Sequence, residues 1–358
     1  MSRLTQLIGK HPALLTLLVV VSLVVLPEVT LRALRWPPAA HWHDELPPNP
    51  TYLWVLDPGI YRHGSQTTTI NLAGMRGRLP GDVGEGQRRV LLVGDSSIFG
   101  WEVPDGSTLA ESLEKELGNR VAVFNGGVPG YSTEQSRRWL DDLLPATRPQ
   151  LVVIANQWSD STISAFVDRQ LIEEASTFGY RVRYHALRLA NYARLWRAVR
   201  YATRGSGGDT AFRRAIDGLL SSHNVGQGKS RVPVDDYASN LAAMVEQSRQ
   251  AGADVILLML ACPMDLASGN AGIGEGASIL AFRHAMEKVA NETGCPLIRA
   301  EDPLRSAGLP ASALFVDNIH PSAAGHAAIA QGLARFLMDH GWEQGGTLCQ
   351  TTDSSALK

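Results

Sequence analysis

The chain of 358 residues has little cysteine and almost no net charge. Three cysteines are too few for a disulfide framework. Cys262 and Cys295 are expected at opposite ends of parallel strands, too far apart to bridge, so all three thiols are predicted to be free. A net charge of −2 gives no overall field that would attract nucleic acid or acidic polymers, so no nucleic-acid partner is expected.

Charge is wholly absent from residues 13–26, where Thr16 and Ser22 are the only polar side chains. Continued to Leu31, this run has about the length that spans a bilayer. It has no polar face, which argues against a buried soluble helix. No small-x-small cleavage site follows Leu26, which favours an uncleaved signal anchor over a cleaved signal peptide. The short tail would then stay in the cytoplasm, and the large domain would be exported to a periplasmic or extracellular location.

The sequence also lacks the patterns of metal and nucleotide sites. His41 and His43 form a short pair with no further ligands at metal-binding spacing. The glycine-rich stretch 125–130 has neither the Lys-Ser/Thr of a P-loop nor the spacing of a dinucleotide fingerprint. No metal and no nucleotide cofactor are therefore expected.

Short apolar runs alternate with amphipathic stretches through most of the chain, and both ends differ from the middle. Val90–Val93 is uniformly apolar, which is typical of a strand buried on both faces. Strands are predicted at 90–93, 121–124, 151–155, 254–260 and 296–299, and helices at 107–117, 133–144, 235–250, 279–292 and 323–338. This alternation predicts a three-layer α/β/α fold around a parallel sheet of about five strands. Ser107 is the expected cap of the first of these helices.

Changes in composition divide the chain into four regions. The expected regions are 1–36, the signal anchor or transmembrane helix; 37–88, a proline-rich connector with a small β lead-in; 89–341, the main α/β domain with an insertion at 165–232; and 342–358, a disordered tail. The insertion contains a basic segment, residues 181–214, with nine arginines and a single acidic residue, Asp209. This segment is either a cap that touches the membrane or an anionic glycan, or a solvated helix packed on the core.

Ser96 stands where the first strand of the predicted sheet gives way to a helix. Gly94 ends the strand, and Asp95 and Ser96 are residues that favour a helix start. A serine at this junction lies at the carboxyl end of a parallel strand and at the positive end of a helix, where a developing anion is stabilised. The alternative is that Ser96 only caps the helix.

Asp317 and His320 lie in the segment just before the last predicted helix. An aspartate and a histidine three residues apart in a loop can form a direct hydrogen bond, which fixes the imidazole tautomer and stabilises its protonated form. Pro321 biases His320 toward an extended backbone, which helps to hold its side chain in one direction. Taken alone, the pair would be an ordinary loop feature.

Three segments in this order resemble the SGNH (GDSL-type) serine hydrolases: Gly94-Asp95-Ser96, the glycine-rich stretch 125–130, and Asp317-Asn318-Ile319-His320-Pro321. The resemblance covers roughly residues 65–340 and implies a flavodoxin-like hydrolase fold. It also implies that Ser96 attacks an ester carbonyl, that His320 is general base and then general acid, and that Asp317 orients His320.

The resemblance further implies an oxyanion hole, with one departure from the family pattern. The backbone N–H groups of Ser96 and Gly127 would be two of its donors. The third donor of the family is an asparagine in a Gly-x-Asn-Asp segment, but residues 155–160 read Ala-Asn-Gln-Trp-Ser-Asp. Ser159 stands at the place of that asparagine, and Asn156 is the alternative donor.

Together these features predict a serine esterase that hydrolyses an acyl or acetyl ester of a carbohydrate or lipid through an acyl-enzyme. One alternative is an acyltransferase that uses the same serine and moves the acyl group to a glycan hydroxyl. A second is a non-catalytic protein that keeps the fold to bind or assemble a polymer. The expected partners are an acylated glycan or lipid as substrate, and the membrane through the N-terminal helix.

Overall fold

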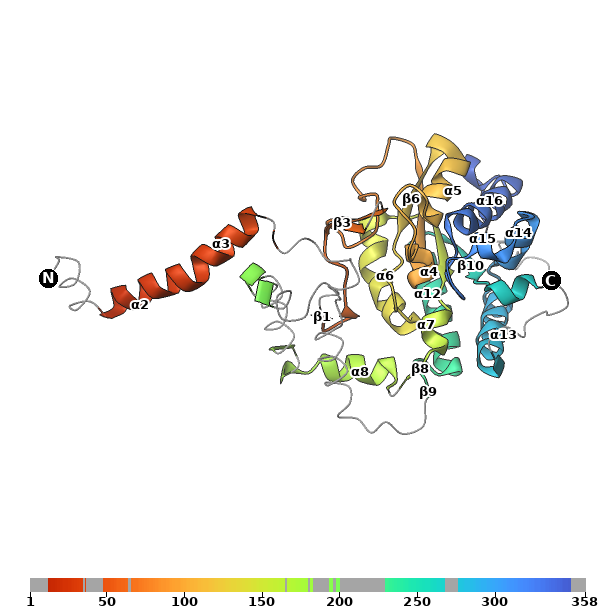
Figure 1. Cartoon of the computed structure of the whole chain (residues 1–358). Coiled ribbons are helices and arrows are strands. Elements are labelled where there is room, and N and C mark those ends of the chain that lie inside the picture. Colours follow the sequence, from red (N-terminus) through yellow and green to blue (C-terminus); the bar gives the residue numbers. More distant parts are fainter. Residues whose placement is uncertain are drawn as a thin grey trace.

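A computed structural model of the chain describes residues 12–34, 36, 48–63, 66–164, 166–179, 181–182, 193–195, 198–199, 229–267 and 276–348. Figure 1 shows a packed α/β domain and, projecting away from it, one N-terminal helix.

The centre of the domain is a parallel sheet of five strands. Along the chain these are β5 (Arg88–Gly94), β6 (Val121–Asn125), β7 (Leu151–Ala155), β10 (Asp254–Met259) and β11 (Leu297–Arg299). In space their order is β11-β10-β7-β5-β6, and all four pairings are parallel. This is the 2-1-3-4-5 order of flavodoxin-like sheets, which confirms the predicted fold class. The order reverses between β5 and β7, and such sheets bind ligands at the carboxyl ends of the strands that flank this switch point.

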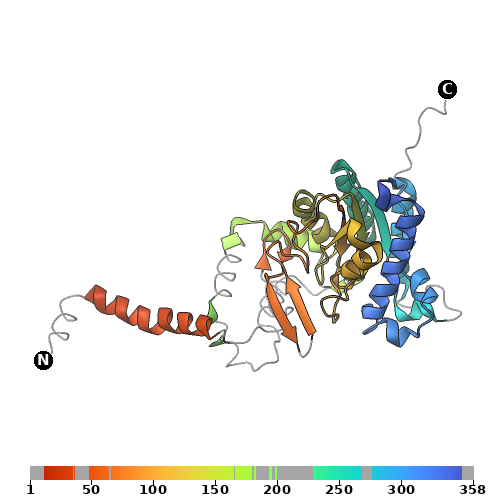
Figure 2. The same ribbon diagram turned by 90° about the horizontal axis from the view of Figure 1, so that it is seen from above.

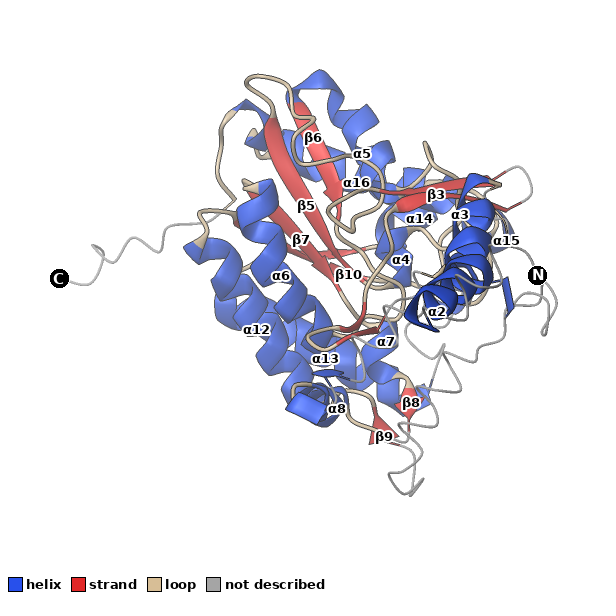
Figure 3. Cartoon of the chain, turned by 90° about the vertical axis from the view of Figure 1, so that its left-hand side faces the viewer, coloured by secondary structure: helices blue, strands red, loops and turns tan. Residues whose placement is uncertain are grey.

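Helices cover both faces of the sheet, as Figure 3 shows. One face carries α5 (Leu109–Leu117), α14 (Glu301–Ser306) and α16 (Ala323–Asp339), and the other carries α6 (Thr133–Thr147), α12 (Val234–Gln250) and α13 (Gly276–Thr293). Successive residues of β5 alternate between the two cores: Val90 and Leu92 face one, and Leu91 and Val93 face the other. Because both faces are buried, the central strands β5, β7 and β10 each contain a continuous apolar run.

The predicted helix ends differ from the structure in detail. The prediction that Ser107 caps α5 is wrong. The cap is Thr108, whose hydroxyl accepts the Glu111 N–H while the Glu111 carboxylate accepts the Thr108 N–H at 3.0 Å. This reciprocal capping box satisfies two N–H groups at the helix start, which Ser107, one residue earlier, does not do. Helix α6 also continues past residue 144 to Thr147 with Pro145 inside it.

Residues before the main sheet pack against it more extensively than the sequence indicates. Within the expected β lead-in, β4 (Gln66–Ile70) forms an antiparallel hairpin with β3 (Gly59–His63), shown in orange in Figure 2. Leu53 and Met75 are buried, and Arg76 forms a β-bridge with Asn125 at the end of β6. Residues 53–76 thus pack with the main domain, and the division at residue 89 remains a prediction.

The carboxyl-terminal segment corrects the predicted tail at 342–358. Trp342 is fully buried, and its indole N–H donates to the Asp254 carboxylate at 3.1 Å. The Arg88 guanidinium lies over the indole, 3.8 Å from the ring centroid. The large apolar area of the indole and this charge contact hold residues 342–348 on the domain. Residues 349–358 lie outside the described residues.

The cysteines are placed as expected where the structure describes them. Cys262 follows β10, Cys295 precedes β11, and both are buried free thiols. Cys349 lies outside the described residues.

The N-terminal apolar run is helical from Pro12 to Ala33, comprising α2 (Pro12–Val20), the π-helical turn η1 (Val21–Val25) and α3 (Leu26–Ala33). Its section from Leu15 to Ala33 is long and apolar enough to cross a membrane, and none of it is buried. Within the described part of the chain this is the one candidate spanning helix, and a signal sequence passes the same test of length and composition.

The insertion after β7 is described at its two ends and, between them, only at residues 193–195 and 198–199. It begins with α8 (Asp168–Ala175) and rejoins the domain at β9 (Lys229–Ser230), which pairs with β8 (Ile163–Ser164). Most of the basic segment, including Arg183 and Arg197, lies outside the described residues, so the predicted cap remains a prediction.

Candidate active site

Ser96 lies at the switch point of the sheet, directly after β5. It opens the short helix α4 (Ser96–Phe99), and Asp95 caps this helix by accepting the Ser97 N–H at 2.9 Å. Gly94 is required here because an added Cβ would lie 2.7 Å from the Ala155 carbonyl oxygen of β7. The Ser96 N–H is one of the first N–H groups of the helix, which have no partner within the helix and carry its positive partial charge.

The side chains of Ser96, His320 and Asp317 form one hydrogen-bonded chain. Ser96 Oγ lies 2.7 Å from His320 Nε2, and His320 Nδ1 lies 2.6 Å from Asp317 Oδ2. The other Asp317 oxygen accepts the backbone N–H groups of Ile319 and His320. The structure thus brings together the three residues that the sequence singles out, although Ser96 and His320 are far apart in the chain.

The loop that carries His320 is a hairpin-like turn before α16. The Val316 N–H donates to the His320 carbonyl at 2.9 Å, and Phe315 forms a β-bridge with Pro321. Ser322, which caps α16, donates its N–H to the Leu314 carbonyl at 2.8 Å. These contacts fix the backbone on both sides of His320.

Two carboxylates near the histidine have opposite electrostatic environments. Burial raises the pKa of Asp317, but hydrogen bonds from His320 and from the Ile319 N–H outweigh it, so the pKa lies below its usual range. Asp95 is fully buried, and burial raises its pKa despite hydrogen bonds from the Ser97 and Ser159 N–H groups and the nearby His320. Asp317 is therefore the carboxylate that stays ionised beside the imidazole.

Gly127 is placed beside the nucleophile turn, but its N–H is already engaged. It donates to the Asn125 side-chain oxygen at 3.1 Å, while the Asn125 amide donates to the Phe99 carbonyl at 3.2 Å. An added Cβ on Gly127 would come within 2.5 Å of the Phe99 nitrogen, so only glycine fits this close approach to α4. The structure therefore does not present the Gly127 N–H as the free donor that the family resemblance implies.

The structure separates the two candidates for the third donor. Asn156 is fully buried, and its amide nitrogen donates to the Tyr131 carbonyl at 3.2 Å and to the Ser136 hydroxyl at 2.9 Å. Both amide hydrogens are thus used away from the nucleophile. Ser159 lies in the short helix α7 (Trp158–Ser161) that follows β7, and its N–H donates to the second Asp95 oxygen at 3.4 Å. Asp95 therefore connects the Ser96 turn directly to the Ser159 turn.

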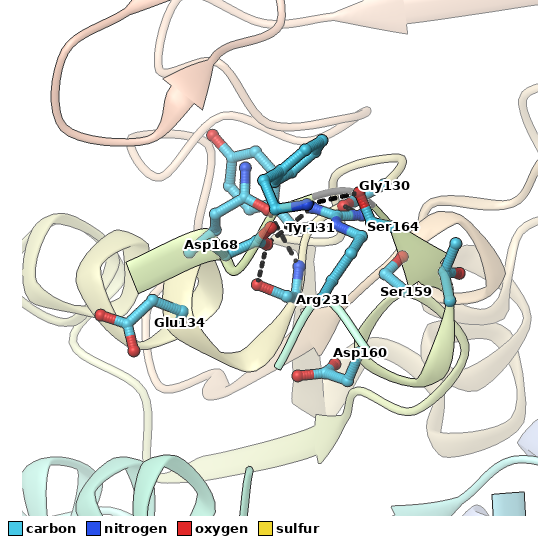
Figure 4. Close-up of polar contacts among 12 residues, drawn as sticks. Gly130, Tyr131, Glu134, Ser159, Asp160, Ser164, Asp168 and Arg231 are labelled. Atoms are coloured by element: carbon cyan, nitrogen blue, oxygen red, sulfur yellow. Dashed lines mark hydrogen bonds and ion pairs between the residues drawn. The ribbon is translucent and has the colours of Figure 1, made fainter. Parts of the chain in front are cut away.

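A buried ion pair joins the two ends of the insertion and contacts the glycine-rich loop. The Arg231 guanidinium, 10% exposed, contacts the fully buried Asp168 carboxylate through two nitrogens, at 3.1 and 2.7 Å. It also donates to the Gly130 carbonyl at 2.8 Å, and Figure 4 shows the group beside Ser159 and Asp160. Because Asp168 and Arg231 stand at the two ends of the insertion, the pair ties both ends to the loop that contains Gly127. Nothing in the sequence pattern indicates this pairing.

Arg76 is a second residue that sequence reasoning missed. It is only 2% exposed and donates to the carbonyls of Phe99 and Gly100, which end α4, at 3.0 and 2.6 Å. It also pairs with Asp105 at 3.1 Å. A guanidinium has five donors in a fixed fork, so it can satisfy several helix-end carbonyls at once. Arg76 thereby fixes the C-terminal end of α4, the helix that begins at Ser96.

Among the described residues, no group of three or more histidine, cysteine, aspartate and glutamate side chains is arranged to hold a metal ion. His41 and His43 lie outside those residues.

The family model described as the GDSL-like lipase/acylhydrolase family matches residues 92–328. The chain therefore belongs to this family, and it is an SGNH-type carboxylic ester hydrolase. No curated protein matches the sequence.

Several solved structures are similar. The acetylxylan esterase Axe2 of Geobacillus stearothermophilus shares 16% identity, with 70% of this chain and 94% of that chain covered and a TM-score of 0.43. A G-D-S-L family protein of Desulfitobacterium hafniense shares 16% identity, with 70% and 99% covered and a TM-score of 0.42. TesA shares 20% identity, with 70% and 99% covered and a TM-score of 0.42.

Proposed function

We propose that the protein is a serine esterase in which Ser96 is the nucleophile, His320 the general base and acid, and Asp317 the residue that orients His320. The observation that carries the proposal is the continuous contact from Ser96 Oγ through both ring nitrogens of His320 to Asp317. In this arrangement Nδ1 donates to Asp317, which leaves the Nε2 lone pair free to accept the serine proton. Serine attack then gives an acyl-enzyme and an alcohol, and water hydrolyses the acyl-enzyme in the second step.

The oxyanion in this proposal is stabilised by the Ser96 N–H at the start of α4 and by the Ser159 hydroxyl. Gly127 contributes only if its N–H breaks its hydrogen bond to the Asn125 side-chain oxygen or donates to that oxygen and the oxyanion at once. Loss of a single oxyanion donor typically costs about two to three orders of magnitude in rate. A hole with one short-chain hydroxyl and one engaged N–H is consistent with a slower enzyme than one with three free donors.

The test is hydrolysis of a short activated acyl ester by the full chain in mild detergent. Wild type should act well above background, and Ser96→Ala should lose activity by about four to six orders of magnitude, down to background, with unchanged folding. Ser97→Ala is the matched control, because Ser97 is the next residue and contacts Asp95 through its backbone. Equal activity of Ser96→Ala and wild type would contradict the proposal.

The proposed substrate is an acyl or acetyl ester of a carbohydrate or lipid, in keeping with the lipase/acylhydrolase family. Product analysis with a polyol present would identify a transferase, because the acyl group would then appear on the polyol instead of being released as free acid. A folded wild type with no turnover in either assay would favour the non-catalytic binding protein.

We further propose that the helix Leu15–Ala33 anchors the protein in a membrane, with the catalytic domain exported. This is supported by the length and apolar composition of that helix and by the absence of buried residues in it. Retention of the chain in membranes after alkaline extraction, with the domain open to externally added protease, is the expected result. Release of a shorter soluble form would indicate a cleaved signal sequence.

A further inference from the structure

Trp101 places its indole against the imidazole of His320. The two ring centroids lie 5.5 Å apart with an angle of 21° between the planes, so the rings are stacked. Trp101 is half-buried and packs against the aromatic cluster of Tyr52, Phe99 and Tyr131. It is thus the side chain that covers a face of the histidine whose edges contact Ser96 and Asp317.

The backbone of Trp101 is tied to the nucleophile. Gly100 ends α4 with a φ of 87°, and this left-handed turn directs the chain away from the helix. The Trp101 N–H then donates to the Ser96 carbonyl at 3.1 Å. The same residue therefore contacts Ser96 through its backbone and His320 through its ring.

The loop that follows Trp101 is fixed from two other directions. Arg76 donates to the carbonyls of Gly100 and Val103, on both sides of Trp101 in the chain. The Asp105 N–H donates to the Thr67 carbonyl of the lead-in hairpin at 2.9 Å. The indole is thus presented to the histidine by a supported loop, and we expect it to keep that position during the reaction.

We propose that Trp101 is a positioning residue for His320: it holds the imidazole plane in line with Ser96 and stabilises the imidazolium that forms when the serine proton is transferred. The face of an indole carries negative electrostatic potential, so it attracts a cationic ring stacked on it more than a neutral one. The proton moves from Ser96 Oγ to His320 Nε2 as the Oγ–carbonyl bond forms, and the positive charge develops on the ring that Trp101 covers. The inference rests on the proposed triad.

Other charges act on the same imidazole. Asp317 faces it from its own loop, and the buried Asp95 acts on it from the nucleophile turn. His326 on α16 is fully buried, and burial lowers its pKa to about 3, so it stays neutral and adds no competing charge. Arg76 faces His326 from the lead-in segment. None of these groups is altered by a change at Trp101.

The experiment compares Trp101→Leu, Trp101→Phe and wild type, as full chains in detergent, through kcat, KM and the pH dependence of kcat/KM. We expect Trp101→Leu to lower kcat about ten-fold with KM within two-fold, because the variant loses both the positioning of the ring and the stabilisation of its charged state. The acid limb of the pH profile should move down by about half a pH unit, since the imidazolium of the free enzyme is destabilised too. Trp101→Phe retains an aromatic face and should recover most of kcat, with a smaller shift in the same direction.

Trp139→Leu is the matched control. Trp139 packs in the same aromatic cluster, 5.4 Å from the Tyr52 ring, but lies on α6. It should lower thermal stability without moving the acid limb. A Trp101→Leu enzyme whose acid limb and kcat equal those of wild type, or whose only change is a higher KM, would overturn the inference.

If Trp101→Leu does not fold, the test rests on Trp101→Phe. An acid limb of the Trp101→Phe enzyme that is identical to that of wild type then overturns the inference. Ser96→Ala is measured in parallel. An active Ser96→Ala contradicts the proposed triad itself, whereas an inactive Ser96→Ala with an unaffected Trp101→Leu contradicts only the role of Trp101.

Discussion

The turn that carries Ser96 is enclosed by the protein, whereas the loop that carries His320 lies at the surface. On the nucleophile side, Asp95 and Arg76 are almost fully buried, and both form hydrogen bonds with backbone groups of α4. On the histidine side, the Asp317 side chain is 45% exposed and the His320 side chain 12% exposed. The two sides meet through the contact of Ser96 with His320 and through the stacking of Trp101 on that ring.

This difference predicts which substitutions lower folding stability and which lower catalytic activity. A buried polar group that loses its partner retains its full desolvation penalty, so changes on the nucleophile side should affect folding. An exposed residue loses little when its partner is removed, so changes on the histidine side should leave folding intact and affect activity. The three predictions below test this separation.

The largest expected effect is that of Asp317→Asn on activity. An asparagine amide at this position would donate to His320 Nδ1, which would place the ring proton on Nε2 and remove the lone pair that accepts the Ser96 proton. We expect kcat to fall by about four orders of magnitude, as wrong-tautomer substitutions in such triads do. The melting temperature should stay close to that of wild type. A large loss of stability would show that this loop is part of the folding core.

Stability should respond most to Arg76→Met. This change leaves three backbone carbonyls and Asp105 without their buried cation, and breaking such a buried set typically costs about 3–5 kcal/mol. The measurement is urea unfolding of the full chain in detergent. Arg78→Met is the matched control, because Arg78 and Glu114 are each 28% exposed, and such a pair contributes about 1 kcal/mol or less. Equal losses in the two variants would contradict the separation.

The sequence predicts the two sides to different degrees. The parallel sheet and its helices follow from apolar runs and helical spacing, because both faces of the sheet must be buried. The contact between Asp317 and His320 is predicted from their spacing of three residues, but the proximity of Ser96 to this pair follows only from the resemblance to a family, since no local pattern relates residues that far apart. That their side chains form one chain is a result of the structure, and their roles remain our proposal.

The supporting residues could not be predicted, for a physical reason. Arg76 contacts residues 23 to 29 positions later in the chain, and Arg231 contacts Asp168 across the whole insertion. Such pairings depend on where the folded chain places a guanidinium, and a single arginine gives no periodic signal. The burial of Trp342 is unpredictable for a related reason: one aromatic residue in a polar tail gives no pattern, and only the folded chain brings it into the apolar core beside Arg88 and Asp254.

The smallest of the three effects concerns Asp160, a buried carboxylate next to Ser159. One of its oxygens accepts the Thr133 N–H and hydroxyl, at 2.8 and 2.6 Å, and the other has no partner among the described residues. Burial raises its pKa to about 7. Below about pH 4 the group is protonated in both the folded and the unfolded states. As the pH rises from about 4 to about 7, the unfolded chain releases the proton while the folded chain retains it, so the free energy of unfolding decreases.

Asp160→Asn removes this dependence, because an amide resembles the protonated acid in shape and does not titrate. Relative to wild type, the variant should therefore gain stability as the pH rises from 4 to 7, by on the order of 2 kcal/mol. Asp82→Asn, the same change at an exposed position, should show no such trend. If the free energy of unfolding of both variants changes with pH as that of wild type does between pH 4 and 7, Asp160 is ionised in the folded protein. The nucleophile side would then hold a buried charge as readily as the exposed loop of Asp317 does, and burial would not distinguish the two sides.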